Sequence, residues 1–308
     1  MRALTSHLAR AAVVAALPAL ATAQTYVGRA DSVFTWHGSL GSSAVLTIRN
    51  FNGPIDVRPS SGNSIELRAE KRTDRGGGSI TDVQFEIQQP GSGDVTICAA
   101  YRGNNPCDDD RNRDRDRDDD TNWRRYVTVA MTIMVPKGAR VRVATGNGAV
   151  SVERVSGDLV ASTGNGKVYV SGTDGPVRVT TGNGDVDVRD VKAAVRVNTG
   201  NGRVTVGTSE GPVEARTGNG DIVVTMSKLR ASEDMTFSTG SGDVRVTLPA
   251  GYNGELDATT GNGHLSSDFD LKVQGRMDPH RVRATIGDGG PRLRLTTGNG
   301  RLEIRKGS

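Results

Sequence analysis

The segment T-G-N-G-D-V-D-V, Thr181–Val188, is the strongest indication of the fold, because its first four residues recur along the chain. T-G-N-G also begins at Thr145, Thr163, Thr199, Thr217, Thr260 and Thr297, and T-G-S-G begins at Thr239. The first four steps between these starts are 18 residues each, and the later steps are 22, 21 and 37 residues. Such a short, fixed period is typical of a solenoid, in which each repeat forms one coil that stacks on its neighbours.

Apolar and polar residues alternate within each repeat. Counted from its Thr, the residues at places 6 and 8 are Val or Ile in the first six repeats, as at Val186 and Val188. In the four regular repeats places 15 and 17 are also apolar, as at Val195 and Val197. Alternation with a period of two predicts a β-strand with one buried face. Each repeat therefore predicts two short strands, and stacked repeats would share a continuous Val-rich core.

The Gly-Asn-Gly of each repeat falls where one strand ends and the next begins. A sharp corner requires positive φ, which Gly adopts freely and Asn adopts better than most residues. Stacked strands lie about 4.8 Å apart, so successive Asn amides could hydrogen-bond along the stack. We therefore expect a structural turn ladder formed by Asn147, Asn165, Asn183, Asn201, Asn219, Asn262 and Asn299. Gly300 belongs to the last repeat of the sequence and is expected to have a neighbouring coil on one side only, so we expect substitutions there to be tolerated better than at Gly184.

Three kinds of repeated ligand site fit the repeat less well than a structural corner. Glycine-rich calcium repeats place an Asp two residues after the last Gly, where this chain has Val, as at Val186. Acyltransferase hexapeptide helices need a small apolar residue at place 12, which here holds Ser156, Asp174, Lys192 or Glu210. Phosphate-binding loops precede a helix, and no helical pattern follows these corners. The sequence therefore predicts no cofactor and no metal at the corners.

Catalytic residues are sparse in this sequence. After residue 23 the His residues are His37, His264 and His280, and none belongs to a catalytic motif. Outward places carry carboxylates such as Asp185, Asp187 and Asp221, which a polysaccharide lyase or hydrolase could use. Charged outward faces are common in soluble proteins, so we expect a protein that is not an enzyme, with the polysaccharide-active enzyme as the alternative.

Met1–Ala23 resembles an export signal, with Arg2 and Arg10 before an apolar run and an A-T-A cleavage site. That run is too short to span a bilayer, so an exported protein in the periplasm, outside the cell or on its surface is expected.

Without this segment the chain has 37 basic and 35 acidic residues, a balance that argues against nucleic-acid binding. In an oxidising compartment Cys98 and Cys107 are expected to form a disulfide.

Residues 24–137 contain strand-like segments without the repeat, namely 44–50, 64–71, 82–88 and 126–135. An Asp/Arg-rich insertion, residues 108–122, interrupts them, and its composition predicts disorder. Asp114, Asp116 and Asp118 give a weaker calcium-loop alternative, because Asp119 stands where such a loop has Gly. We therefore expect an all-β chain with a β region over 24–137 that caps a β-solenoid over 138–308, the cap being antiparallel.

Several motifs together resemble one bacterial family. They are the V-P-K-G strand end at Val135–Gly138, the serial T-G-N-G-x-V-x-V units and the closing G-D-G-G-P-R-L-R-L-T-T-G-N-G-R-L-E-I. This combination is similar to the bacterial putative adhesin family of β-strand-repeat proteins, a domain of unknown function, over about Ala44 to Arg305. The resemblance implies a surface or envelope binding module, and no catalytic or binding residues carry over from it.

A solenoid with an extended face favours repetitive partners such as glycans or other envelope polymers. The alternatives are a polysaccharide-active enzyme on the same scaffold and a purely structural envelope protein. No membrane span is expected, since no second long apolar run follows the export signal.

Overall fold

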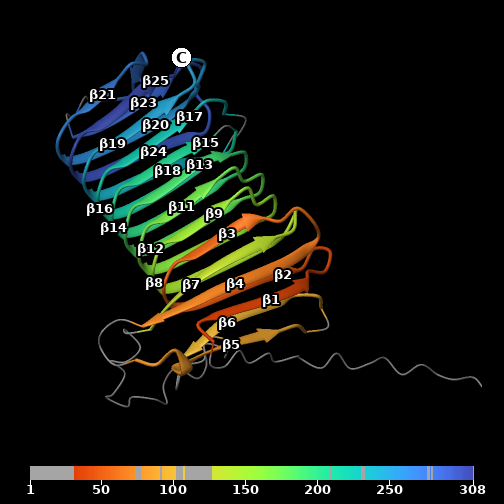
Figure 1. Ribbon diagram of the computed structural model, residues 1–308. Helices are drawn as coiled ribbons and strands as arrows, with labels where there is room; N and C mark the ends of the chain where they lie inside the picture. The colour runs from red at the N-terminus through yellow and green to blue at the C-terminus, as the bar shows by residue number, and fades with distance from the viewer. Residues whose placement is uncertain are drawn as a thin grey trace, which may run out of the picture.

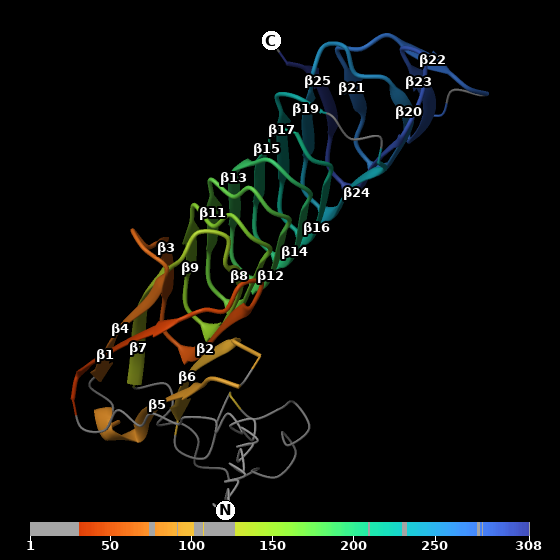
Figure 2. The same cartoon turned by 90° about the vertical axis from the view of Figure 1, so that its right-hand side faces the viewer.

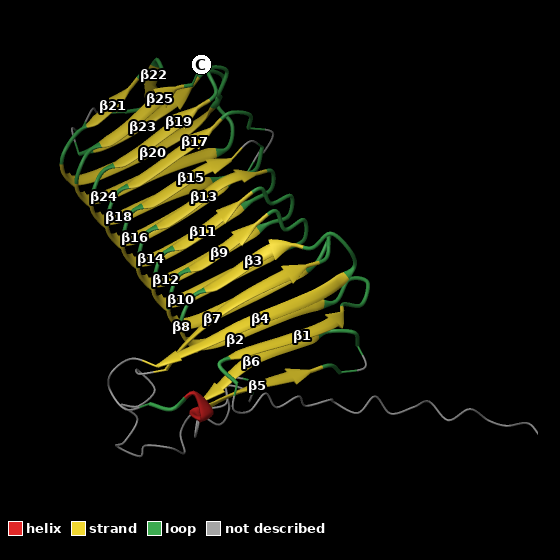
Figure 3. Ribbon diagram, in the orientation of Figure 1, coloured by secondary structure: helices red, strands yellow, loops and turns green. Residues whose placement is uncertain are grey.

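Two long β-sheets face each other along an elongated molecule, as the computed structural model shows (Figure 1). The structure describes residues 31–73, 78–90, 92–101, 107, 127–208, 210–229, 233–275, 278 and 280–307. The export signal and the Asp/Arg insertion, with Asp114, Asp116 and Asp118, lie outside these residues. Within the described part of the chain the helical structure is one 3-10 turn, η1 (Ile80–Asp82), and the rest is strand and loop (Figure 3).

Sheet A has 12 strands among the described residues. In spatial order they are β1 (Val33–Ser39), β4 (Ser64–Thr73), β7 (Val127–Val135), β3 (Ile55–Pro59), β9 (Val150–Glu153), β11 (Val168–Ser171), β13 (Val186–Val191), β15 (Val204–Thr208), β17 (Ile222–Met226), β19 (Val244–Leu248), β25 (Leu302–Lys306) and β21 (Leu265–Ser267).

Sheet B has 13 strands among the described residues. In spatial order they are β22 (Leu271–Val273), β23 (Arg281–Ile286), β20 (Gly254–Asn262), β24 (Arg292–Asn299), β18 (Met235–Ser241), β16 (Val213–Asn219), β14 (Val195–Asn201), β12 (Val177–Asn183), β10 (Leu159–Asn165), β8 (Arg140–Asn147), β2 (Val45–Asn52), β6 (Val95–Tyr101) and β5 (Val83–Gln88).

Each repeat contributes one strand to each sheet, so equivalent residues stack in columns. Val168 pairs with Val186 in sheet A, and Val177 pairs with Val195 in sheet B, both in parallel register. These side chains are at most 2% exposed and belong to one hydrophobic cluster. Figure 2 shows the two sheets that enclose this cluster facing each other. Burying a Val side chain contributes about 1.5–3 kcal/mol, so the repeated columns provide much of the core. The expected all-β solenoid is confirmed.

Antiparallel strands close the first end of the stack. In sheet A, β4 pairs antiparallel with both β1 and β7, and in sheet B, β5 pairs antiparallel with β6. Both sheets nevertheless cross residue 137 without a break, because β2 pairs with β8 and β3 pairs with β9 in parallel. Cys98 of β6 and Cys107 form a disulfide, with their Cα atoms 5.8 Å apart.

The last repeat of the sequence is not the last coil of the stack. β24 lies between β18 and β20, and β25 lies between β19 and β21. Gly300 therefore has a coil on each side, and its amide donates to Asn262 O while its carbonyl accepts from Thr260. The expectation that Gly300 has a single neighbouring coil is wrong, because chain order and stacking order differ here.

Candidate functional site

The Thr of each corner is buried and supports the adjoining coil. Thr181 Oγ1 donates to Gly166 O at 3.2 Å, and Thr199 Oγ1 donates to Gly184 O at 3.2 Å. The same bond recurs from Thr163, Thr217, Thr239, Thr297 and Thr260. A buried hydroxyl needs such an acceptor, so the Thr column is used by the fold and is closed to a ligand.

Both Gly residues of the corner are required by stacking. A Cβ on Gly184 would lie 2.0 Å from Gly166 O, and a Cβ on Gly182 would lie 2.5 Å from Gly164 O. Gly184 also has a φ of +153°, a backbone conformation in which a residue with a side chain would be strained. Close backbone approach therefore explains both Gly residues without a ligand.

The corner Asn side chains bond to one another along the outside of the stack. Asn165 Nδ2 donates to Asn147 Oδ1 at 2.9 Å, and the same contact continues through Asn183, Asn201 and Asn219 at 2.7–2.9 Å. Beyond the Ser241 coil, Asn262 Nδ2 donates to Asn299 Oδ1 at 2.7 Å. Each bond replaces solvent contacts and contributes about 1 kcal/mol net, so the column works as a structural ladder.

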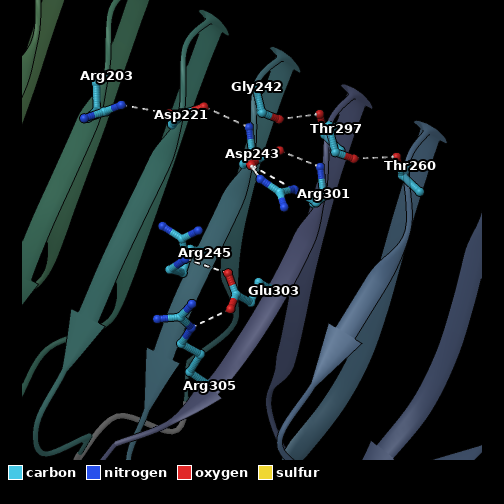
Figure 4. Close-up of polar contacts among 11 residues, drawn as sticks. Arg203, Asp221, Gly242, Asp243, Arg245, Thr260, Thr297, Arg301, Glu303 and Arg305 are labelled. Carbon is cyan, nitrogen blue, oxygen red and sulfur yellow. Dashed lines mark hydrogen bonds and ion pairs between the residues drawn. The ribbon is translucent and has the colours of Figure 1, made fainter.

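Charged residues follow the corners at place 5 and pair between coils. Arg203 Nη2 donates to Asp221 Oδ2 at 3.0 Å, and Asp221 Oδ1 accepts from Asp243 N at 3.0 Å (Figure 4). Asp243 accepts from Arg301 N at 2.8 Å and from the Arg301 guanidinium at 2.9 and 3.2 Å. Hydrogen bonding from the Arg301 backbone amide, and then from its side chain, lowers the pKa of Asp243 below its ordinary value. This column holds neighbouring coils in register.

A groove of about 310 Å³ crosses the outer side of sheet B at the starts of four successive strands. Places 14 and 16 of these coils point outward and form its two walls, while place 15 lies between them. Its lining residues are Asp158, Leu159, Val160, Pro176, Val177, Arg178, Ala194, Val195, Arg196, Pro212, Val213, Glu214, Glu233 and Asp234. The groove therefore runs across the strands and along the axis of the stack.

One wall of the groove combines an apolar side chain with adjacent guanidinium groups. Val160 is 38% exposed and is one of two exposed large apolar side chains in the described part of the chain. Next to it, Arg178 and Arg196 are paired residues on β12 and β14. Arg196 Nε donates to Glu214 Oε2 at 2.6 Å, whereas the Arg178 side chain has no ion pair within the described residues. Like charges on neighbouring strands repel, so Arg178 offers a guanidinium group to an anionic ligand.

A family model matches residues 46–305 of this chain, and it is the model of the Toastrack family, DUF4097. This chain is a member of the Toastrack family. A search of curated proteins finds no match to it.

Three solved structures resemble this Toastrack chain over nearly their full lengths. A putative adhesin from Bacteroides fragilis is 11% identical, covering 89% of this chain and 96% of that one, with a TM-score of 0.43. A putative adhesin from Parabacteroides distasonis is 10% identical, covering 90% and 98%, with a TM-score of 0.32. A putative cell adhesion protein from Clostridium sporogenes is 11% identical, covering 89% and 100%, with a TM-score of 0.28.

The sequence-predicted catalytic candidates are not brought together in the Toastrack fold. His37 lies on β1 at one end of the stack, whereas His264 and His280 lie near the other end. Asp187 bonds to Arg189, and Asp185 and Asp221 belong to the corner column. No group of three or more His, Cys, Asp or Glu residues that could hold a metal occurs among the residues described. In the same residues no helix is long and apolar enough to cross a membrane.

Sequence reasoning missed two features of the Toastrack stack. The first is a coil whose corner, Asn50–Gly53, stacks on the Thr145 corner with Asn52 beside Asn147 and φ of +125° at Gly53. The signal was N-G-P-I-D-V, residues 52–57, which keeps places 3, 4, 6 and 8 of the repeat. The second is the groove, whose outward residues differ from coil to coil and so leave no repeated motif.

Proposed function

We propose that this Toastrack protein is an exported, non-enzymatic binding module that holds linear glycans or other envelope polymers in the sheet B groove. The observation that carries the proposal is the course of the groove, since places 14, 15 and 16 of four successive coils, with Glu233 and Asp234, line it along the stack. A groove that continues from coil to coil along the stack fits an extended chain better than a compact ligand.

The groove offers the contacts that a sugar chain uses. Pro176 and Pro212 on one wall and Val160 on the other provide apolar surface for the C–H faces of sugar rings. Arg178 can donate a bidentate hydrogen bond to a carboxylate or sulfate, and Asp158 and Glu233 can accept bonds from hydroxyl groups. Linear polysaccharides that carry a carboxylate or sulfate among many hydroxyl groups are therefore the preferred class of ligand, since four carboxylates line the groove beside its two Arg side chains.

Two features support a place outside the cytoplasm. Residues 1–23 have the pattern of an export signal, and Cys98–Cys107 is a disulfide of the kind that persists in oxidising compartments. We place the protein in the periplasm or at the cell surface, where envelope polymers are within reach.

The test is an array of linear polysaccharides, with uronic-acid, sulfated and neutral members, probed with the protein and with Arg178→Ala. The parent should bind acidic members, and Arg178→Ala should lose that binding by about tenfold, the effect of losing one charge-assisted contact. Arg142→Ala is the matched control, because Arg142 lies in the same outward column of sheet B but outside the groove.

The alternatives give different results in the same experiment. Shortening of a bound polysaccharide would replace the binding module with a polysaccharide-active enzyme. An absence of binding to every member would contradict the proposal and favour a purely structural envelope protein. Equal binding by Arg178→Ala and the parent would contradict the assignment of binding to the groove.

A further inference from the structure

The C-terminal coil, β24 and β25, occupies a slot inside the stack. It separates β18 and β19 on one side from β20 and β21 on the other. Residues 249–286, which include the last antiparallel strands, join the stack in both sheets through this coil (Figure 2). A segment from the end of the chain therefore completes a gap between coils that precede it in the sequence.

Charge complementarity matches the coil to its slot. Arg301 forms three hydrogen bonds with Asp243, and Glu303 accepts from Arg245 Nε at 2.6 Å (Figure 4). On the opposite side Arg294 Nη2 lies 3.4 Å from Asp257 Oδ2. These partners are 37 to 58 residues apart in sequence, so chain connectivity does not impose their pairing.

The neighbouring T-G-N-G coil lacks the charges that the slot recognises. In that coil His264 and Ser266 stand where the C-terminal coil has Arg301 and Glu303. If it stacked directly on β19, Asp243 and Arg245 would lose their partners. The slot is therefore selective for the C-terminal coil although both coils share the corner motif.

The link to the C-terminal coil is short and rich in Gly. Between β23 and β24 lie Gly287, Gly289 and Gly290, all with positive φ, at +59°, +81° and +141°. Gly changes conformation with little steric cost, so this link can act as a hinge. A segment on a hinge, held by contacts that another copy of the chain offers equally, can be exchanged between two chains.

We propose that the slot accepts the C-terminal coil of a second copy of this chain, so that two copies exchange residues 292–306 and form a dimer. Each exchanged coil makes the same bonds with Asp243, Arg245 and Asp257 that it makes within one chain. This inference is independent of the groove and of its ligand.

The first test mixes two full-length variants, Asp243→Arg and Arg301→Asp, after shared incubation in mild denaturant. Each variant alone has like charges facing each other in its slot, whereas exchange between the two restores opposite charges in both slots. Native mass spectrometry should therefore show a shift from one-chain to two-chain mass in the mixture. The matched control is Asp221→Arg with Arg203→Asp, an ion pair of the same column between coils that follow each other in sequence. This control should remain at one-chain mass.

The second test needs no charge change and covers the case in which those variants do not fold. Ser238 and Thr296 are paired residues of β18 and β24, so chains carrying Ser238→Cys and Thr296→Cys should crosslink to each other after mixing and oxidation. One chain carrying both changes should crosslink internally, which checks the geometry. The control pair is Ser162→Cys and Thr180→Cys, on the neighbouring strands β10 and β12, where both residues also stand directly before the corner Thr. This pair should give no disulfide between chains. Internal crosslinking without any disulfide between position 238 of one chain and position 296 of another would overturn the proposal, as would a charge-swap mixture that stays at one-chain mass.

Discussion

At the residue scale, the corner glycines fix how closely two coils approach. A Cβ on Gly184 would lie 2.0 Å from Gly166 O, and one on Gly300 would lie 2.1 Å from Gly242 O. The sequence predicts the positive φ of Gly184, because a β corner needs it. It does not predict that Gly242, and not Gly263 of the preceding repeat, is the residue that crowds Gly300, because the position of the last coil depends on contacts distant in sequence.

We predict that Gly184→Val and Gly300→Val each lower the free energy of unfolding by about 3 kcal/mol or more, from backbone strain and overpacking. Gly207→Val is the control, since a Cβ at this strand position meets only Val188 O at 4.0 Å. Urea unfolding of the three variants measures the effect. A Gly300→Val variant as stable as the control would contradict the close approach of the last coil to the Gly242 corner.

Thr173 is a buried residue whose hydroxyl has no hydrogen-bond partner among the residues that the structure describes. Val155 and Val191 occupy the same place in the adjoining coils, so the surroundings suit an apolar side chain. Thr173→Val should therefore stabilise the protein by about 1 kcal/mol. Thr181→Val removes the bond to Gly166 O and should destabilise it by a similar amount. Thermal melts compare the two, and a loss of stability in Thr173→Val would show that its hydroxyl is satisfied.

At the element scale, sequence periodicity accounts for most strands. Val186 and Val188 alternate with Asp187 because stacked coils bury the same places in every repeat. The coil at Asn50 escaped detection because Asn50 and Phe51 replace the Thr and first Gly of the motif. Asn50 Nδ2 instead donates to Gly53 O and Val129 O, so a different side chain supports the same corner.

The contact between β19 and β25 should depend on pH through Asp243. Its folded pKa is lowered from 3.8, mainly by the Arg301 backbone amide, so the charged carboxylate stabilises the fold above about pH 3.8. That contribution is lost as the pH falls through the lower folded pKa. Asp243→Asn should reduce stability at neutral pH and flatten the decline in acid. Melting temperatures between about pH 2 and pH 7 measure this, and an unchanged pH profile in Asp243→Asn would refute it.

At the scale of the whole molecule, the corner motif stacks the coils, and the groove is the proposed binding site. Thr, Gly and Asn of the corner bond to or pack against neighbouring coils, so the recurrence of the motif is explained without a ligand. The groove instead arises from places 14 and 16, where Pro176, Arg178 and Pro212 are not demanded by stacking. The corner motif can be found in the sequence because it repeats. The groove cannot be found in this way, because it depends on which residues become neighbours in three dimensions.

The most direct test compares Asn183→Ala with Arg178→Ala in two assays, thermal melting and binding to an acidic polysaccharide array. Asn183→Ala should lose about 1 kcal/mol of stability per ladder bond and retain binding, whereas Arg178→Ala should melt like the parent and lose binding. The reverse result, with binding lost in Asn183→Ala at normal stability and kept in Arg178→Ala, would contradict the account.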